Sequence, residues 1–256
     1  MKHSRAPLIT TILVLLFFYL PILLLIGNSF NASRFGTSWQ GFSWKWYELL
    51  FHRDDLWIAL KNSLLIACCA SLGAMILGTS AAFALHRFRS RLQTQHQILL
   101  TLPLVLPEIL IGMALLSLFV AIRLPLGLFT VGLAHVTFCL SYVALVVQAR
   151  LQDFDFSVME AARDLGATRS QAFFRVLLPL LAPGILAGGL LAFTLSIDDF
   201  VVTFFVSGAG SDTLPLKINS MIRHSKELPV INALSSLLLL LTFLLVATAQ
   251  RLMKKS

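Results

Sequence analysis

The sequence predicts an all-α, polytopic membrane protein in which six transmembrane helices form a single domain. Two observations carry this prediction. Of the 256 residues, 57% are hydrophobic and only 12% are charged, whereas soluble proteins have about 25% charged residues. The apolar residues also gather into six runs, each close to the roughly 20 residues that a helix needs to cross the hydrocarbon core. These runs lie near residues 8–26, 62–85, 98–122, 128–147, 184–206 and 231–249.

The first run, 8–26, follows the basic residues Lys2 and Arg5, as the apolar part of a signal peptide would. It is longer than the usual 7–15-residue apolar region of a signal peptide, and further spans follow it. We therefore interpret it as an uncleaved first membrane helix, which Pro21 is expected to bend.

All four tryptophans lie in or directly after residues 28–56, between the first two runs. Tryptophan is typical of the membrane–water interface, and an aromatic belt needs no ligand. The alternative is that one or two rings, with Trp46 as the candidate, face a pathway mouth and bind a cation through the π face. A second segment outside the membrane, residues 207–229, contains LPLKINSMI and is expected to form a short surface or gating helix.

The third run, 98–122, contains an acid where lipid is expected. Glu108 lies ten residues into the run, between Pro107 and Gly112. The prolines predict an interrupted helix with free backbone carbonyls beside the carboxylate. A charge in mid-membrane costs about 2.5–3.5 kcal/mol on insertion scales and usually marks an ion or substrate route. Broken helices near the midplane are also where transporters bind substrates. The alternative is a protonated carboxyl without a substrate role.

The fifth run, 184–206, contains Asp198 and Asp199. Adjacent helical residues point about 100° apart, so one carboxylate of the pair is expected to face the pathway. Ser196 is a further candidate, but it needs an irregular backbone to share the site. The alternative, that the acids only cap a helix, is disfavoured because apolar sequence continues through Val206. His135, in the fourth run, is interpreted as a residue that hydrogen-bonds between helices.

Basic residues predict the orientation. The loop His86–Gln97 carries three arginines and no acid, and cytoplasmic loops are enriched in Lys and Arg. With six spans, both termini and the segment Arg150–Pro183 are then also cytoplasmic. The basic residues on this side are Lys2, Arg5, Arg87, Arg89, Arg91, Arg150, Arg163, Arg169, Arg175, Arg251, Lys254 and Lys255.

The net charge of +8 does not indicate nucleic-acid binding, because the basic residues lie at the ends of apolar runs. The three cysteines, Cys68, Cys69 and Cys139, lie inside apolar runs without metal-ligand spacing. We interpret them as small buried apolar residues and predict no metal site.

The segment Arg150–Pro183 is too long and too ordered for a simple connection. Ser157 followed by Glu160 fits a capping box, with an apolar helix face after it. Gly166 is expected to end this helix in the left-handed conformation. Thr168 and Gln171 can begin a second helix. Pro179 is expected to end it by forcing Leu178 out of α geometry.

The spacing Glu160-Ala161-Ala162, Gly166, Val176 and Leu178-Pro179 resembles the EAA loop of ABC importer permeases, although that family has Ile at the position of Val176. The resemblance implies the type I (MetI-like) permease fold. It also implies that helices around Glu160, Ala161, Ala162, Gly166 and Pro179 couple the membrane domain to a separate ATPase subunit. The alternative is an amphipathic helix that lies on the membrane surface.

Five further stretches resemble the permeases of spermidine/putrescine importers. They are NSFNASRFGTSWQGFSWKWY from Asn28, HVTFCLSYV from His135, EAARDLGA from Glu160, FTLSIDDFVV from Phe193 and LPLKINSM from Leu214. The resemblance implies a bacterial inner-membrane protein that moves polyamines from periplasm to cytoplasm. The implied partners, besides the lipid bilayer, are a second related permease, two ATPase subunits and a periplasmic polyamine-binding protein. One departure is Glu108, where relatives are expected to have Asp.

The chain has no GxxxxGK[ST] phosphate loop, so ATP and Mg²⁺ are expected in the ATPase subunits and no cofactor in this chain. Another small organic or inorganic cation is the alternative cargo, and unpaired membrane acids disfavour anions such as sulfate. An intramembrane aspartyl protease that uses Glu108 with an Asp is a hypothesis from another functional class. It would need two carboxylates that share a proton, which adjacent Asp198 and Asp199 cannot provide on a helix.

Overall fold

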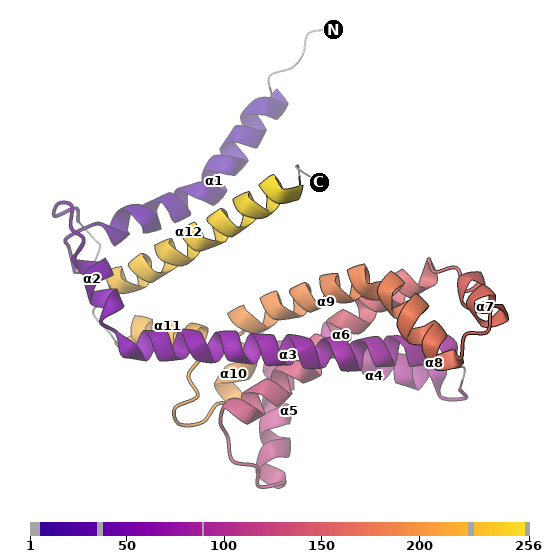
Figure 1. Ribbon diagram of the computed structural model, residues 1–256. Coiled ribbons are helices and arrows are strands. Elements are labelled where there is room, and N and C mark those ends of the chain that lie inside the picture. The colour runs from indigo at the N-terminus through magenta and orange to yellow at the C-terminus, as the bar shows by residue number, and fades with distance from the viewer. Residues whose placement is uncertain (1–5, 35–37, 89, 225–227, 254–256) are drawn as a thin grey trace. The chain divides into compact units, whose positions relative to one another are not determined.

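The computed structural model describes residues 6–34, 38–88, 90–224 and 228–253 (Figure 1). Within these ranges the ordered elements are helices, apart from a single antiparallel bridge between Asn31 and Phe42. The all-α prediction is therefore confirmed. The chain divides into two compact units, one of residues 1–57 and 217–256 and the other of residues 58–216.

In the first unit, α1 (Ala6–Ser29) packs against α12 (Leu228–Met253), which also contacts the short α2 (Lys45–Phe51) (Figure 1). Pro21 lies inside α1, which continues through it as one helix. The connection from α1 to α2 is rich in aromatic rings that pack on one another. These rings belong to Phe30, Phe42, Trp44 and Tyr47.

In the second unit, the long helices α3 (Asp54–Arg87, which enters this unit at Ile58), α6 (Leu128–Gln152) and α9 (Leu178–Asp198) pack closely where glycines remove the side chain. A Cβ atom on Gly78 of α3 would lie 2.9 Å from the Leu140 carbonyl oxygen of α6. A Cβ atom on Gly188 of α9 would lie 3.2 Å from the Cα atom of Val143. Small residues are typical of helix contacts in membranes, because there the backbones must approach for van der Waals packing.

The third apolar run forms two helices, as its prolines predict. α4 (Gln93–Val105) and α5 (Glu108–Ala121) meet at an angle of 113°. Leu106 is extended, with ψ 138°, and Pro107 precedes the first residue of α5. α5 packs against α10 (Val201–Val206), where Gly112 lies against the ring of Phe205. The prediction of an interrupted helix is confirmed.

Four helices in the described part of the chain are long and apolar enough to cross a membrane, and the bent pair α4–α5 provides a fifth candidate. The four are Pro7–Ser29, Asp54–Arg87, Leu128–Gln152 and Arg169–Asp198. The sixth predicted run, 231–249, lies in α12, whose apolar part Leu228–Leu244 is shorter. The number six and the span limits therefore stay predictions. The predicted surface helix is α11 (Leu214–His224).

The segment 150–183 contains the predicted helix, glycine turn and helix. α7 (Ser157–Asp164) is followed by Gly166 with φ +91°, which confirms the left-handed turn. α8 (Arg169–Ala172) begins with the predicted capping box. The Gln171 N–H donates to Thr168 Oγ1 at 3.2 Å, and the Thr168 N–H donates to Gln171 Oε1 at 2.9 Å.

Two local predictions in this segment are wrong. Ser157 does not cap α7, because the helix begins after Phe156 and the Ser157 N–H donates to Asp155 Oδ1 at 2.9 Å. The hydrogen bonds from Ser157 hold the pKa of the exposed Asp155 carboxyl below its usual range.

Pro179 does not end the second helix either. Leu178 keeps α geometry, with φ −59° and ψ −44°. The preceding residues Phe173–Leu177 form a π turn, η1, in which the Leu178 N–H bonds to the Phe173 carbonyl five residues back. The wider turn gives room for a proline ring that lacks an N–H. Residues 169–198 therefore run as one continuous helical path, α8–η1–α9.

Candidate functional site

Two interrupted helices meet in the second unit. Glu108 is the first residue of α5, and Asp198 is the last residue of α9 before a two-residue break at Asp199 and Phe200. α5 packs on α10, which begins directly after this break, so the two breaks lie in the same part of the unit. The fold thus brings together the acids that the sequence places 90 residues apart.

The two adjacent aspartates have different environments. The side chains of Glu108 and Asp198 are exposed in this chain, whereas Asp199 is 8% exposed and Ser196 4%. The backbone is extended at Asp199, with ψ 126°, so α9 ends at Asp198 and the chain changes direction after Asp199. Of the four predicted pathway residues in this unit, Glu108 and Asp198 are therefore accessible. Ser196 and Asp199 are buried.

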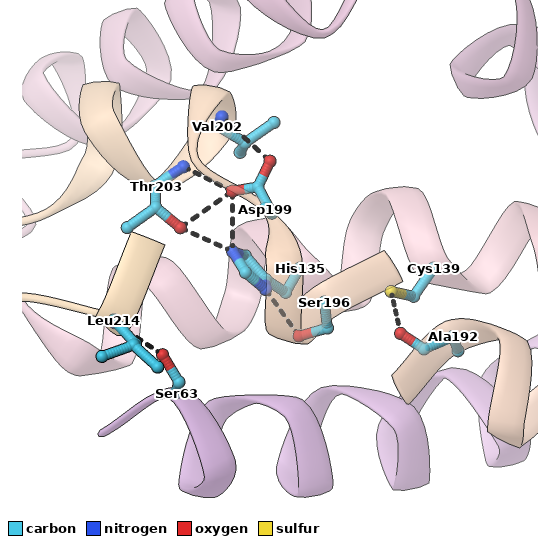
Figure 2. Close-up of polar contacts among 9 residues, drawn as sticks. All are labelled: Ser63, His135, Cys139, Ala192, Ser196, Asp199, Val202, Thr203 and Leu214. Carbon is cyan, nitrogen blue, oxygen red and sulfur yellow. Dashed lines mark hydrogen bonds and ion pairs between the residues drawn. The ribbon is translucent and has the colours of Figure 1, made fainter. Parts of the chain in front are cut away.

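Asp199 caps α10 (Figure 2). Its Oδ1 atom accepts the Val202 N–H at 3.2 Å, and its Oδ2 atom accepts the Thr203 N–H at 2.8 Å. The Thr203 hydroxyl donates to Oδ2 as well, at 2.8 Å. The sequence analysis disfavoured the alternative that these acids cap a helix, but Asp199 does cap one. A carboxylate at the N-terminus of a helix satisfies N–H groups that have no helical partner.

His135 of α6 joins this cap to α9. Its ring is 0% exposed, and Nδ1 lies 2.7 Å from Ser196 Oγ. Nε2 lies 3.0 Å from Thr203 Oγ1 and 3.3 Å from Asp199 Oδ2 (Figure 2). The interpretation of His135 as a residue that hydrogen-bonds between helices is confirmed. The sequence analysis did not identify Thr203 as a site residue. The only indication in the sequence was that Thr203 carries a hydroxyl one helical turn after Asp199.

Trp46 lies in the first unit and is 3% exposed. Its indole N–H donates to the Asn31 carbonyl oxygen at 2.7 Å, and the Lys45 ammonium nitrogen lies 5.1 Å from the ring centroid. The accessible tryptophans of this unit are Trp39 and Trp44, with 62% and 60% exposed. A pathway role of Trp46 stays a prediction.

The segment 150–183 presents an uncovered apolar face. On and next to α7, Val158 is 43% and Leu165 90% exposed, and Glu160, Ala161 and Gly166 are exposed too. Exposed apolar side chains on an otherwise polar segment are typical of a surface that binds a partner. Pro179, at the start of α9, is exposed as well.

The same segment is anchored to the end of α3. The ring of Phe156 stacks on His86 and that of Phe173 packs on Phe83, each at a centroid distance of 5.1 Å. The arginine-containing loop after His86 and the segment 150–183 therefore lie at the same end of the second unit (Figure 1).

Residues 74–255 match the model of a protein family described as the binding-protein-dependent transport system inner membrane component. The chain belongs to this family. The spermidine/putrescine transport system permease protein PotC of Haemophilus influenzae is 41% identical over 94% of this chain and 93% of that protein. PotC of Escherichia coli is 42% identical over 91% and 88%. The putrescine transport system permease protein PotI of Escherichia coli is 46% identical over 92% and 86%. These relatives are named as transport subunits and not as enzymes.

Two solved structures have a similar fold. One is a bacterial ABC transporter involved in the import of alginate, with a TM-score of 0.74 over 98% of this chain and 99% of that chain, at 16% identity. The other is an amino acid ABC transporter with histidines, with a TM-score of 0.57 over 80% of this chain and 98% of that chain, at 18% identity. The predicted ABC permease fold is confirmed, and the chain is a multi-pass membrane permease.

Proposed function

We propose that this chain is the permease subunit of an ATP-driven ABC importer that carries spermidine, putrescine or both from the periplasm to the cytoplasm. The relatives named above support this cargo. The structural observation that carries the proposal is the packing of α5 on α10, since the breaks at these two helices each carry an exposed carboxylate, that of Glu108 and that of Asp198.

The site suits a cation that carries N–H donors. Carboxylates in the membrane are stable when they face a route that cations occupy. Pro107 has no N–H, so the carbonyl of Pro103, four residues earlier, lacks its helical donor and is free to accept a hydrogen bond from an ammonium group. Carboxylates and free carbonyls together bind ammonium groups better than they bind a bare anion, which has no donors.

Ser196 and Asp199 act in this proposal through the hydrogen bonds that they make and not through direct contact with the cargo. Ser196 and Asp199 are buried, and their hydrogen bonds hold the break between α9 and α10. Asp198 projects from the end of α9 beside this break. Another small cation is the alternative cargo. A protease site that uses Asp199 is disfavoured, because its carboxylate already accepts hydrogen bonds from Val202 and Thr203 and is not available to share a proton with a second acid.

The energy for transport comes from a separate ATPase. The exposed face of α7, with Leu165, is the proposed contact, and ATP and Mg²⁺ bind in two ATPase subunits rather than in this chain. The continuous helical path of residues 169–198 begins beside this contact and ends at Asp198, so movement of the coupling segment is transmitted to the proposed cation site. A second related permease and a periplasmic polyamine-binding protein complete the importer.

The proposed orientation places both termini and the segment 150–183 in the cytoplasm of a bacterium, with the chain in the inner membrane. The arginine-containing loop after His86 and the segment 150–183 share one end of their unit, which supports a single cytoplasmic side for both. The basic residues Lys2, Arg5, Arg89, Lys254 and Lys255, which contribute to the same argument, lie outside the described residues.

Uptake of labelled putrescine and spermidine by membrane vesicles that contain the whole complex tests the proposal. We expect Asp198→Asn and Glu108→Gln each to reduce uptake greatly while the complex still assembles. Asp54→Asn, a matched change at an exposed acid in the first turn of α3, should have little effect. Normal uptake by both pathway variants would overturn the site. Absence of polyamine uptake by the unaltered complex, with another cation transported instead, would overturn the cargo.

A further inference from the structure

The joint between α9 and α10 is built differently from an ordinary helix end. It lies in the apolar fifth run, yet four buried polar side chains from three helices converge on it. They are His135 of α6, Ser196 of α9, Asp199 in the break and Thr203 of α10 (Figure 2). Buried polar groups are costly unless every one has a partner, and each of these four has one.

The hydrogen bonds determine where the protons are. Thr203 has one hydroxyl proton, which it donates to Asp199 Oδ2. The 3.0 Å contact from His135 Nε2 to Thr203 Oγ1 and its 3.3 Å contact to Asp199 Oδ2 therefore need a proton on Nε2. In a neutral imidazole Nδ1 is then an acceptor, and Ser196 donates its hydroxyl proton to it.

In this assignment both carboxylate oxygens of the buried Asp199 are engaged within the fold. Each carboxylate oxygen accepts a backbone N–H of α10, and Oδ2 also faces the hydroxyl of Thr203 and the N–H of His135. Ser196 is only 4% exposed, and its hydroxyl oxygen lies against the imidazole of His135 at 2.7 Å. Neither group is arranged to bind a cation in the pathway. Asp198, one residue away, is exposed at the end of α9.

The position of His135 is itself set by the packing of α6 on α9. Contacts between the two helices repeat every four residues. His135 meets Ser196, the Cys139 thiol donates to the Ala192 carbonyl oxygen at 3.4 Å, and Val143 packs on Gly188. Positions four apart lie on one face of a helix, so the two helices are antiparallel and in a single register. His135 is the member of this series that reaches across the break to α10.

We propose that Asp198, and not Asp199, presents its carboxylate to the transported cation, and that His135 is the positioning residue that holds it there. This inference rests on the proposed function. His135 links the end of α9 to the cap of α10, so it fixes the place and direction in which the last residue of α9 projects. The effect of His135 on the cargo is exerted through Ser196, Asp199 and Thr203.

Uptake kinetics of the whole complex test this role with a conservative and a non-conservative variant. The amide of Gln can replace Nε2–H as a donor, so His135→Gln should keep the KM for putrescine near that of the unaltered complex. His135→Leu has no donor and should raise the KM about tenfold or more, as expected when a hydrogen bond to a charged group is lost. Equal effects of the two substitutions, or an unchanged KM in both, would overturn the inference.

A double-mutant cycle tests whether His135 and Asp199 act through the same cap. His135→Leu and Asp199→Asn should be non-additive, because both break the same cap. His135→Leu added to Glu108→Gln should multiply the two effects on KM, since Glu108 has no bond to this network. Independent, multiplicative effects of His135 and Asp199 would contradict the shared role.

A thiol-accessibility experiment covers the case in which a variant no longer transports. Cys68, Cys69 and Cys139 are replaced by Ala, Asp198→Cys is introduced, and its reaction rate with a cationic methanethiosulfonate reagent is measured in the assembled complex. His135→Leu should change this rate but leave that of Thr194→Cys, an exposed position one turn earlier in α9, unaltered. If the unaltered complex imports polyamines but His135→Leu leaves the reaction rate at position 198 unchanged, the role of His135 is overturned and the proposed function is not. If the unaltered complex does not import polyamines, the proposed function is overturned instead.

Discussion

Thr203 donates both its backbone N–H and its hydroxyl to one carboxylate oxygen of Asp199, each at 2.8 Å. Both residues are buried, and the His135 ring lies against the same oxygen. An acid in an apolar membrane run is usually assigned to a substrate route. Here the carboxylate is a part of the fold, and its neighbour Asp198 is the accessible one.

Thr203→Val tests the structural weight of this contact. The substitution keeps the shape of the side chain and the backbone N–H but removes the hydroxyl, so a buried carboxylate and a buried imidazole both lose a partner. Leaving such a group unsatisfied costs about 1–3 kcal/mol. We expect a lower thermal unfolding midpoint of the purified complex in detergent.

Thr137→Val is the matched control for this prediction. Thr137 is exposed on α6 and donates only to the Leu133 carbonyl of its own helix, so its loss should change the free energy of unfolding by no more than about 0.5 kcal/mol. Equal midpoints for the two variants would show that the Thr203 hydroxyl contributes nothing to stability.

Gly166→Ala tests the turn between α7 and α8. Gly166 has φ +91°, and a side chain in the left-handed region costs roughly 1–2 kcal/mol. No atom outside the turn lies within 4 Å of a Cβ at this position, so the strain comes from the backbone alone. We expect weaker binding of the ATPase in a pull-down of the complex and a lower rate of transport-coupled ATP hydrolysis.

Gly132→Ala serves as the control for the turn. Gly132 also has open space around its Cβ position but lies inside helix α6 without a positive φ. Alanine there should be neutral or favourable, because it is the better helix former by about 1 kcal/mol. Full coupling in Gly166→Ala would contradict the need for the left-handed turn.

Leu165→Ser tests the exposed face of the coupling segment. Because Leu165 is 90% exposed in this chain, its replacement should not lower the stability of the permease itself. If an ATPase covers the side chain, burial of a leucine contributes about 1.5–3 kcal/mol to that contact, and the substitution should weaken ATPase binding about tenfold or more. Titration of the ATPase onto permease in lipid nanodiscs measures the change.

Leu92→Ser is the comparison for Leu165. Leu92 is 55% exposed in the arginine-containing loop, beside α4 and outside the coupling helices. The same substitution there should leave ATPase affinity unchanged. An equal loss of affinity at the two positions would mean that the contact is not specific to the face of α7.

Features that depend on neighbouring residues were predictable from the sequence. The break before Glu108 follows from Pro103 and Pro107, and the turn at Gly166 follows from the freedom of glycine. The capping box at Thr168 and Gln171 needs only three residues of separation. Two predictions of the same kind are wrong because another local arrangement of hydrogen bonds formed instead. Asp155 takes the N–H that was expected to belong to a cap at Ser157, and a π turn accommodates Pro179 within a continuous helix.

The sequence by itself determined that the chain is helical and embedded in a membrane, that its third run is broken at Pro107, and that acids interrupt two apolar runs. Only the tertiary structure decided which of these acids is accessible. His135 lies 61 residues before Ser196 and 68 before Thr203, and no periodicity connects them. Their contact depends on the register of α6 against α9, which the close approach at Gly188 sets. Hydrogen bonds of about 3 Å tolerate no slip of that register, and so packing, rather than local sequence, separates Asp199 from Asp198.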